Sequence, residues 1–268
     1  MSDLRTPKVI AVANQKGGVG KTTTAINLGA ALAMRGRRTV LIDLDPQGNA
    51  ATGLGVERTA RRTTTYDLLL EDARLEDAAL PTDIDGFAIV PATTDLSSAD
   101  AEMMQSGRRT QHLRAALARS NPDCDVILID CPPSLSLLTI NALVAARSVL
   151  VPLQSEFFAL EGLSQLLLTI REVRQSANPA LRLEGVVLTM FDGRNRLCQQ
   201  VEEDARANLG DLVFETRIPR NVRLSEAPSF AQSVLTYDPH SKGAIAYRAL
   251  AGEMLRRAAA VQKEPADV

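Results

Sequence analysis

The sequence contains no tryptophan, and phenylalanine and tyrosine bring its aromatic content to only 3% of 268 residues. Proteins that bind RNA or single-stranded DNA stack bases on aromatic rings, so this composition argues against that class. The three cysteines share no CxxC spacing, and there are only two histidines. A Cys/His zinc site and a disulfide-built secreted scaffold are therefore disfavoured, and we interpret Cys124, Cys131 and Cys198 as small buried side chains.

Long apolar runs are missing too. No stretch reaches the roughly 18 apolar residues that a membrane-spanning helix needs, and the N-terminus lacks the apolar core of a signal peptide. We therefore expect a cytoplasmic protein. Lys and Arg number 30 against 32 Asp and Glu, so no overall basic field attracts nucleic acid. Any contact with DNA must come from a local patch.

Length and patterning predict the fold. At roughly 150 residues per domain the chain is about 1.8 domain equivalents, and we predict one large domain over residues 1–268, with 262–268 as a frayed end. Short β-branched runs alternate with helical patterns, which is typical of βαβ units. The prediction is an α/β fold with a doubly wound, mostly parallel sheet flanked by helices.

The expected strands are Val9–Ala13, Thr39–Asp43, Phe87–Val90, Val126–Asp130, Val149–Leu153 and Val186–Thr189, with a further candidate at Val213–Glu215. The expected helices are Thr23–Met34, Gln111–Arg119, Leu137–Ala145, Leu160–Gln175, Gln199–Asn208 and Ala244–Ala260. Two irregular polar stretches, Gly48–Arg62 and Ile218–Ser229, are expected to be loops with a function.

A glycine-rich turn joins the first expected strand to the first expected helix, and it reads Asn14-Gln-Lys-Gly-Gly-Val-Gly-Lys-Thr-Thr-Thr24. Strand, glycine-rich turn and helix in this order form a P-loop. Its glycines let backbone N–H groups turn inward around phosphate oxygens, and the helix N-terminus adds the positive end of its dipole. Lys21 would neutralise the β- and γ-phosphates, and Thr22 would offer a hydroxyl to Mg²⁺. The residues expected to bind the nucleotide here are Gly17, Gly18, Val19, Gly20, Lys21, Thr22 and Thr23.

The loop departs from the usual P-loop pattern at one position. Gln15 stands where that pattern has glycine, and a second lysine, Lys16, precedes Lys21 by five residues. A cation held beside a bound triphosphate stabilises the charge that develops during phosphoryl transfer. We therefore treat Lys16 and Lys21 as candidate catalytic residues.

Three aspartates follow apolar strands. Asp43 and Asp45 end one strand motif and Asp130 ends another, which places them at the carboxyl edge of the sheet, where doubly wound folds bind ligands. Asp130 would hold Mg²⁺ through water as a Walker B carboxylate. The predicted metal ligands are therefore Thr22, Asp45 and Asp130.

These motifs together resemble one family. Lys16–Thr22 matches the signature P-loop of the deviant Walker A ATPases, and Leu41–Asn49 and Ile127–Ser134 are similar to the second and third nucleotide motifs of that family. With Ile218–Ser229 similar to the late loop, essentially the whole chain resembles the ParA/Soj chromosome-partitioning ATPases, which have the P-loop NTPase fold. The resemblance implies a slow, Mg²⁺-dependent ATP hydrolase that is stimulated by DNA and by a ParB-like centromere-binding protein.

The resemblance also implies roles for single residues in the nucleotide site. Lys16 would reach across a nucleotide-sandwich homodimer to the partner's phosphates. Asp45 would orient or deprotonate the attacking water. The adenine would pack near Pro219 and Asn221.

A further implication concerns DNA. Members of the family bind double-stranded DNA without sequence preference through basic residues of the late segments, on a face that dimerisation completes. Arg194 and Arg223 are our candidates, because two-fold symmetry doubles a small phosphate footprint. ATP-bound dimers would then be associated with the nucleoid.

Other hypotheses stay open. A MinD-like membrane-surface ATPase would carry a C-terminal amphipathic helix with bulky apolar and basic faces. Ala244–Ala260 is alanine-rich and no Phe, Trp or Leu follows Leu255, so we expect no stable membrane association. A small-molecule kinase would need an acceptor pocket, and no separate arginine cluster marks one. An iron–sulfur cluster at Cys131 would need a second, suitably placed cysteine.

Overall fold

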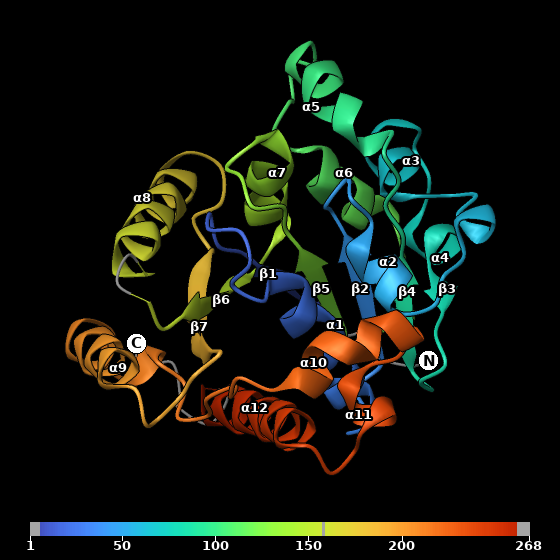
Figure 1. The fold of residues 1–268 in the computed structure, drawn as a ribbon. Coiled ribbons are helices and arrows are strands. Elements are labelled where there is room, and N and C mark those ends of the chain that lie inside the picture. Colours follow the sequence, from blue (N-terminus) through green and yellow to red (C-terminus); the bar gives the residue numbers. More distant parts are fainter. Residues whose placement is uncertain (1–5, 157–158, 262–268) are drawn as a thin grey trace.

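One seven-stranded sheet organises the part of the chain that the structure describes, which is residues 6–156 and 159–261 of a computed structural model (Figure 1). The strands are β1 (Lys8–Val12), β2 (Thr39–Asp43), β3 (Leu80–Pro81), β4 (Phe87–Val90), β5 (Val126–Asp130), β6 (Ser148–Gln154) and β7 (Arg182–Thr189). Their order across the sheet is β3-β4-β2-β5-β1-β6-β7, and every neighbouring pair is parallel except β3 with β4. The predicted doubly wound, mostly parallel sheet is confirmed.

The helices fall into longer and shorter elements. The longer ones are α1 (Lys21–Ala33), α5 (Leu96–Met104), α6 (His112–Arg119), α7 (Leu137–Ala145), α8 (Ala159–Ser176), α9 (Arg196–Leu209) and α12 (Lys242–Val261). The shorter ones are α2 (Asn49–Gly53), η1 (Arg58–Ala60), α3 (Thr65–Leu70), α4 (Leu75–Ala78), η2 (Gly210–Leu212), α10 (Val222–Glu226), η3 (Ala227–Phe230) and α11 (Val234–Tyr237).

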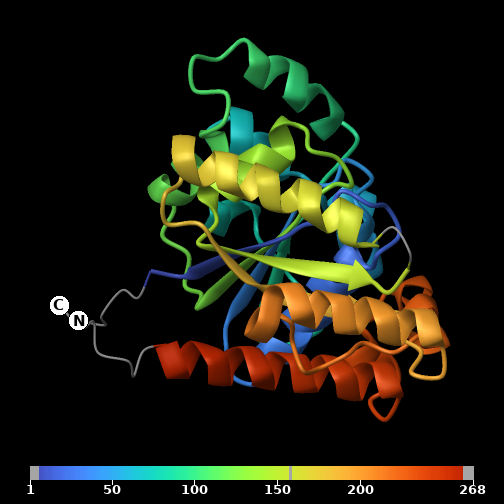
Figure 2. The same ribbon diagram turned by 90° about the vertical axis from the view of Figure 1, so that its left-hand side faces the viewer.

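Helices cover both faces of the sheet. One apolar core joins the sheet to α3, α5, α6, α7 and α8, and the other joins it to α1, α2, α11 and α12. Figure 2 shows α8 and α12 on opposite sides of the sheet. In β5 the side chains of Ile127 and Ile129 enter the first core, whereas Val126 and Leu128 enter the second, because successive residues of a strand point to opposite faces. This is why the central strands are apolar throughout.

The six predicted helices are all present, with ends that differ from the prediction by a few residues. The weakest strand prediction was wrong, because Val213–Glu215 contributes only an isolated bridge between Val213 and Val186. Both segments that were predicted to be loops contain short helices: α2 and η1 lie within Gly48–Arg62, and α10 and the start of η3 lie within Ile218–Ser229. Helices of about one turn are too short to show a periodicity, and tertiary packing stabilises them.

The predicted frayed end, residues 262–268, lies outside the described residues. Along the described ranges, no helix combines the length and the apolarity that crossing a membrane requires. Cys124, Cys131 and Cys198 are buried and carry no disulfide, as expected from the sequence.

Candidate nucleotide site

The loop between β1 and α1 leaves the N-terminus of the helix open. Gly18 (φ +76°) and Gly20 (φ +85°) adopt the left-handed conformation that favours glycine. The helix has neither a side-chain cap nor an acidic residue in its first turn. A Cβ atom added at Gly18 would meet nothing within 4 Å. A phosphate group therefore fits against the first backbone N–H groups of α1, which otherwise have no partner within the helix.

Side chains from neighbouring strands hold this loop in shape. The Asn14 side chain donates to the carbonyl oxygen of Pro152 in β6 (2.8 Å) and accepts from the backbone N–H of Lys16 (3.0 Å). Thr189, the last residue of β7, donates to the carbonyl oxygen of Val19 (2.9 Å). These bonds fix the loop to β6 and β7 through protein groups alone, so they favour the shape of the loop that nucleotide binding needs.

Lys21 is a buried cation in the middle of the site. Its ammonium donates to the carbonyl oxygen of Lys16 (3.0 Å), and the residue is 7% exposed. Burial lowers the pKa of Lys21, while the nearby Asp130, Cys131 and Asp45 raise it. An ammonium in this position gains most from an anion placed beside it.

The ends of three strands meet next to the loop. Asp130, the last residue of β5, is in register with Val12 of β1 and with Asp43 of β2. Both aspartates are fully buried, and burial is the main reason why the pKa of Asp43 rises to about 7 and that of Asp130 rises well above its ordinary value. The charge of Asp43 adds to the rise at Asp130. The strand-end carboxylates thus lie at the carboxyl edge of the sheet, where the sequence placed them.

Asp130 offers the best place for a metal ion. Both of its carboxylate oxygens are buried and accept no hydrogen bond from any described residue. The nearby Thr22 hydroxyl lowers the pKa of Asp130 somewhat, against the effect of burial. It does not form a hydrogen bond with either carboxylate oxygen. Mg²⁺, which prefers oxygen ligands, would provide the missing partner for this carboxylate. Within the described ranges no three His, Cys, Asp or Glu side chains could hold a metal by themselves, so the residues fit Mg²⁺ bound together with phosphate oxygens.

Asp45 lies in the turn that follows β2 and is partly exposed. Its backbone N–H donates to Asp43 Oδ1 (3.2 Å), and its own Oδ1 accepts from the backbone N–H of Gln47 (3.0 Å). The charge of Asp45 raises the pKa of both Lys21 and Asp130. Asp45 is therefore close enough to influence Lys21 and Asp130 electrostatically, and it is also accessible to water.

Arg61, which the sequence analysis missed, ties this turn to its surroundings. Its guanidinium donates to the carbonyl oxygens of Ala92 (3.1 Å) and Val56 (2.9 Å) and to the Thr52 hydroxyl (2.9 Å). A Cβ atom added at Gly48 would come within 2.7 Å of this guanidinium. No local pattern marks Arg61, because the contact with Ala92 joins positions 31 residues apart.

The second lysine of the loop has a different partner. Lys16 Nζ forms an ion pair with Glu156 Oε2 (2.6 Å), and the two side chains are 38% and 47% exposed. Gln154, at the end of β6, donates to the other oxygen of Glu156. No motif pointed to Glu156. Because exposed ion pairs contribute only about 0–1 kcal/mol, Lys16 can exchange this partner for another at low cost.

The predicted adenine contacts lie beside the end of β7. Pro219 forms an isolated bridge with Phe191, whose carbonyl oxygen accepts from the backbone N–H of Arg220 (3.2 Å). Asn221 caps α10, because its Oδ1 accepts from the backbone N–H of Arg223 (2.9 Å). The Asn221 amide nitrogen makes no hydrogen bond among the described residues. It is therefore available to a ligand.

The two candidate DNA-contacting arginines are both paired with carboxylates. Arg194, whose side chain is 92% exposed, makes two hydrogen bonds of 3.1 Å to Asp192. Arg223 pairs with Glu226 (2.8 Å) and with Asp238 (3.3 Å). Arg223 lies in α10 and not in a loop, which corrects the prediction. Each arginine would have to leave a carboxylate to bind a phosphate.

Comparison with known proteins supplies the family. A family model described as an AAA domain matches residues 7–183. The chromosome partitioning protein ParA of Caulobacter vibrioides is 57% identical over 252 residues, which cover 93% of this chain and 94% of that protein. The chain belongs to the ParA/Soj family. Soj, the sporulation initiation inhibitor protein of Bacillus subtilis, is 50% identical over 247 residues that cover 92% of this chain and 98% of Soj.

A solved structure from Mycobacterium smegmatis gives the same fold. It is described as a cobyrinic acid a,c-diamide synthase with bound ADP and magnesium, and it is 41% identical with a TM-score of 0.82, covering 97% of this chain and 98% of that one. The same protein is also known with an ATP analogue and magnesium. This ParA/Soj-family chain is thus a P-loop ATP hydrolase. The roles of its individual residues stay predictions.

Proposed function

We propose that this ParA/Soj-family chain is a DNA-partitioning ATPase that binds ATP and Mg²⁺ at the loop between β1 and α1. The observation that carries the nucleotide part is the buried Lys21 ammonium beside the uncapped N-terminus of α1. Glycines Gly17, Gly18 and Gly20 would admit the phosphates, and Val19, Thr22 and Thr23 would present backbone N–H groups to them. Pro219 and Asn221 would contact the adenine.

Hydrolysis follows from the same arrangement. Bound Mg²⁺ would neutralise charge on the phosphates, and Thr22 and Asp130, with Asp45 nearby, would hold it. Lys21 stabilises the charge that develops on the γ-phosphate as the bond to ADP breaks. Asp45 orients the attacking water and accepts its proton. Because Asp45 is partly exposed, water can reach it.

Dimerisation would complete the site through Lys16. In the single chain this lysine is held by Glu156. The triphosphate of a second copy carries more negative charge than one carboxylate, and the ion pair with Glu156 is exposed and weak. Lys16 would therefore leave Glu156 when two ATP-bound copies meet.

The Lys16→Ala variant tests this step. We expect it to bind ATP with an affinity within about threefold of the parent, because Lys21 and the helix N-terminus are unchanged, but to stay monomeric with ATP. Light scattering with and without ATP measures the mass, and calorimetry measures the affinity. The Glu156→Gln variant is the matched control: it frees Lys16, so ATP-dependent dimers should persist. A parent protein that is monomeric in every nucleotide state would rule out the sandwich.

DNA binding would use Arg194 and Arg223 on the dimer. Both ion pairs are exposed, so exchanging a carboxylate for a DNA phosphate costs little. Two arginines on one copy are too few to hold a DNA duplex at physiological salt, because each phosphate contact contributes modestly and salt weakens it. Two-fold symmetry doubles the contacts. DNA affinity should therefore depend on ATP and be independent of sequence.

Fluorescence anisotropy with random duplexes tests the proposed DNA contacts. Arg194→Ala and Arg223→Ala should each weaken binding to all duplexes alike and lower the salt slope by about two for the dimer, or about one per lost contact. Arg62→Ala, which removes an exposed arginine from the segment before α3, is the control and should bind as the parent does. Equal DNA affinity with and without ATP would contradict the proposal.

A ParB-like centromere-binding protein is the proposed partner, which would stimulate hydrolysis and release the dimer from the nucleoid. No observation on the described residues favours the MinD-like alternative. The diamide synthase description of the Mycobacterium smegmatis protein belongs to a relative at 41% identity, whereas the relatives named ParA and Soj share 57% and 50% of aligned residues with this chain. We therefore keep partitioning as the function.

A further inference from the structure

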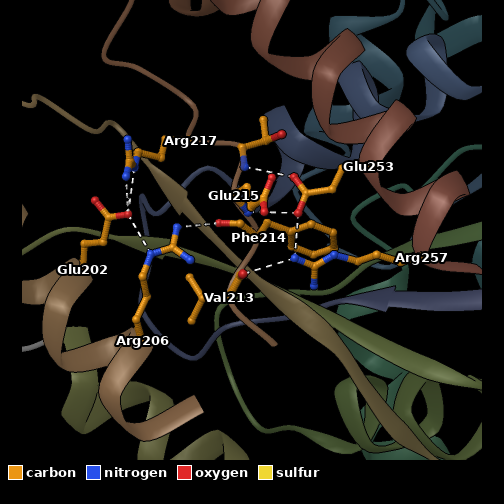
Figure 3. Close-up of polar contacts among 9 residues, drawn as sticks. Glu202, Arg206, Val213, Phe214, Glu215, Arg217, Glu253 and Arg257 are labelled. Carbon is orange, nitrogen blue, oxygen red and sulfur yellow. Dashed lines mark hydrogen bonds and ion pairs between the residues drawn. The ribbon is translucent and has the colours of Figure 1, made fainter. Parts of the chain in front are cut away.

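A buried carboxylate on α12 binds the backbone of the segment that leads to the proposed adenine loop. Glu253 is 4% exposed. Its Oε1 accepts from the backbone N–H of Glu215, and its Oε2 accepts from that of Thr216, both at 2.9 Å (Figure 3). One side chain thus fixes two successive peptide groups that do not belong to any strand or helix.

Arg257, one turn further along α12, binds the same segment. It pairs with Glu253 Oε1 (2.6 Å) and donates to the carbonyl oxygens of Asp211 (2.6 Å) and Val213 (3.1 Å). Its guanidinium also lies over the ring of Phe214, 4.2 Å from the centroid. The segment is therefore bound to α12 through both donors and acceptors of its backbone.

The opposite side of the segment is held by α9. Glu202 accepts from Arg206 (2.9 Å) and from Arg217 (2.8 Å), and Arg206 also donates to the carbonyl oxygen of Phe214 (3.0 Å) (Figure 3). Glu202 accepts hydrogen bonds from arginine side chains, whereas Glu253 accepts them directly from backbone N–H groups of the segment. Of the two carboxylates, Glu253 therefore has the closer control over the path of the backbone.

The segment leads directly to residues 219–221, here called the base loop, which contain the proposed adenine contacts Pro219 and Asn221. The backbone N–H of Ile218, two residues after Thr216, donates to the carbonyl oxygen of Leu188 in β7 (2.8 Å), and Pro219 and Asn221 follow. A segment fixed at Thr216 and again at Ile218 has no freedom to shift the loop toward or away from the nucleotide. Releasing Thr216 would leave the base loop held through Ile218 and Arg220 but would remove the hold from α12, so the position of the loop would be set less tightly. The loop between β1 and α1, which is held by β6 and β7, would stay in place.

We propose that Glu253 is a positioning residue for nucleotide binding, which sets the place of Pro219 and Asn221 against the adenine without touching it. This rests on the proposed base site. Burial disfavours the ionised form, but the hydrogen bonds from Thr216, Glu215 and Arg257 outweigh it and leave the pKa of Glu253 below its ordinary value. The carboxylate is therefore charged at neutral pH. Glutamine has the same shape but only one acceptor oxygen, so its NH₂ group would face a backbone N–H.

The test separates binding of the base from binding of the phosphates. Calorimetry would measure the affinity of the purified chain for ATP, and competition would measure its affinity for inorganic triphosphate, both with Mg²⁺. We expect Glu253→Gln to weaken ATP binding about tenfold, as the loss of a charge-assisted hydrogen bond at the base loop would. Triphosphate affinity should stay within about twofold. Arg256→Ala, which removes an exposed neighbour on α12, should change neither.

Asn221→Ala distinguishes a failure of this inference from a failure of the base site. If Asn221→Ala weakens ATP but not triphosphate while Glu253→Gln changes neither, the base site stands and the positioning role is overturned. If Asn221→Ala leaves ATP affinity unchanged, the base site itself is misplaced and the inference falls with it. A parallel loss of ATP and triphosphate affinity in Glu253→Gln would indicate general unfolding and also overturn the role. If that variant does not fold, Arg257→Lys, which keeps the charge but cannot serve all of the arginine's acceptors, replaces it in the same comparison.

Discussion

Replacing Lys21 with alanine is expected to abolish ATP binding at micromolar protein concentrations, with a loss of affinity on the order of 100-fold or more. Lys21 is buried, its ammonium donates to the carbonyl oxygen of Lys16, and it lies at the open N-terminus of α1. The triphosphate would supply the anion that this cation lacks. Removing the ammonium takes away the side-chain charge that would offset the phosphate charge in this buried part of the site.

Calorimetric titration with Mg²⁺ and ATP measures this loss. Lys242→Ala, which removes an exposed lysine at the start of α12, is the matched control and should bind ATP as the parent does. A melting curve of Lys21→Ala without nucleotide should show a stability equal to or above that of the parent, because a buried ammonium is removed. An undiminished ATP affinity in Lys21→Ala would contradict the nucleotide site.

The sequence predicted those parts of the fold whose signal is local. β2 and β5 are buried along their whole length, and each stood out in the sequence as a short, mostly apolar run that ends in aspartate. The P-loop was evident because strand, glycines and helix are consecutive. Since parallel strands end at one edge, the meeting of Asp43 and Asp130 followed from the fold class alone.

The parts that escaped prediction depend on contacts between distant positions. Glu156 pairs with Lys16 across 140 positions, and Glu253 reaches Glu215 across 38. Nothing in the composition around either glutamate differs from an ordinary solvated helix or loop. The helix α3 carried a local signal that was overlooked: Thr64 and Asp67 form a capping box at its start. Its six residues were too few to show a helical period.

The same reasoning explains the errors at the late loop. Ile218–Ser229 is polar and irregular, which is typical of loops, yet Asn221 caps a short helix there. Arg223 consequently lies on a helical turn, where Glu226 is three positions away and pairs with it. A charge that looks free in the sequence is paired in the structure, because helical spacing brings the two residues together.

Asp45→Ala is expected to separate ATP binding from hydrolysis. Lys21, Thr22 and the glycines that would bind the phosphates are unchanged, so ATP affinity should stay within about threefold of the parent. Loss of the group that we propose positions and deprotonates water should lower the hydrolysis rate by about 10²–10⁴-fold, the usual contribution of a general base. Phosphate release under saturating ATP measures the rate, and calorimetry measures the affinity.

Asp45→Asn makes this test sharper than alanine alone. Its side-chain oxygen can still accept the hydrogen bond from the backbone N–H of Gln47, so the turn after β2 keeps its shape. Asparagine cannot take a proton from water, however, and hydrolysis should fall as far as in Asp45→Ala. If Asp45→Asn hydrolyses ATP at the parent rate, Asp45 only supports the turn. If both variants bind ATP and neither hydrolyses it, the dimer should remain on DNA indefinitely with ATP, because hydrolysis is the step that would release it.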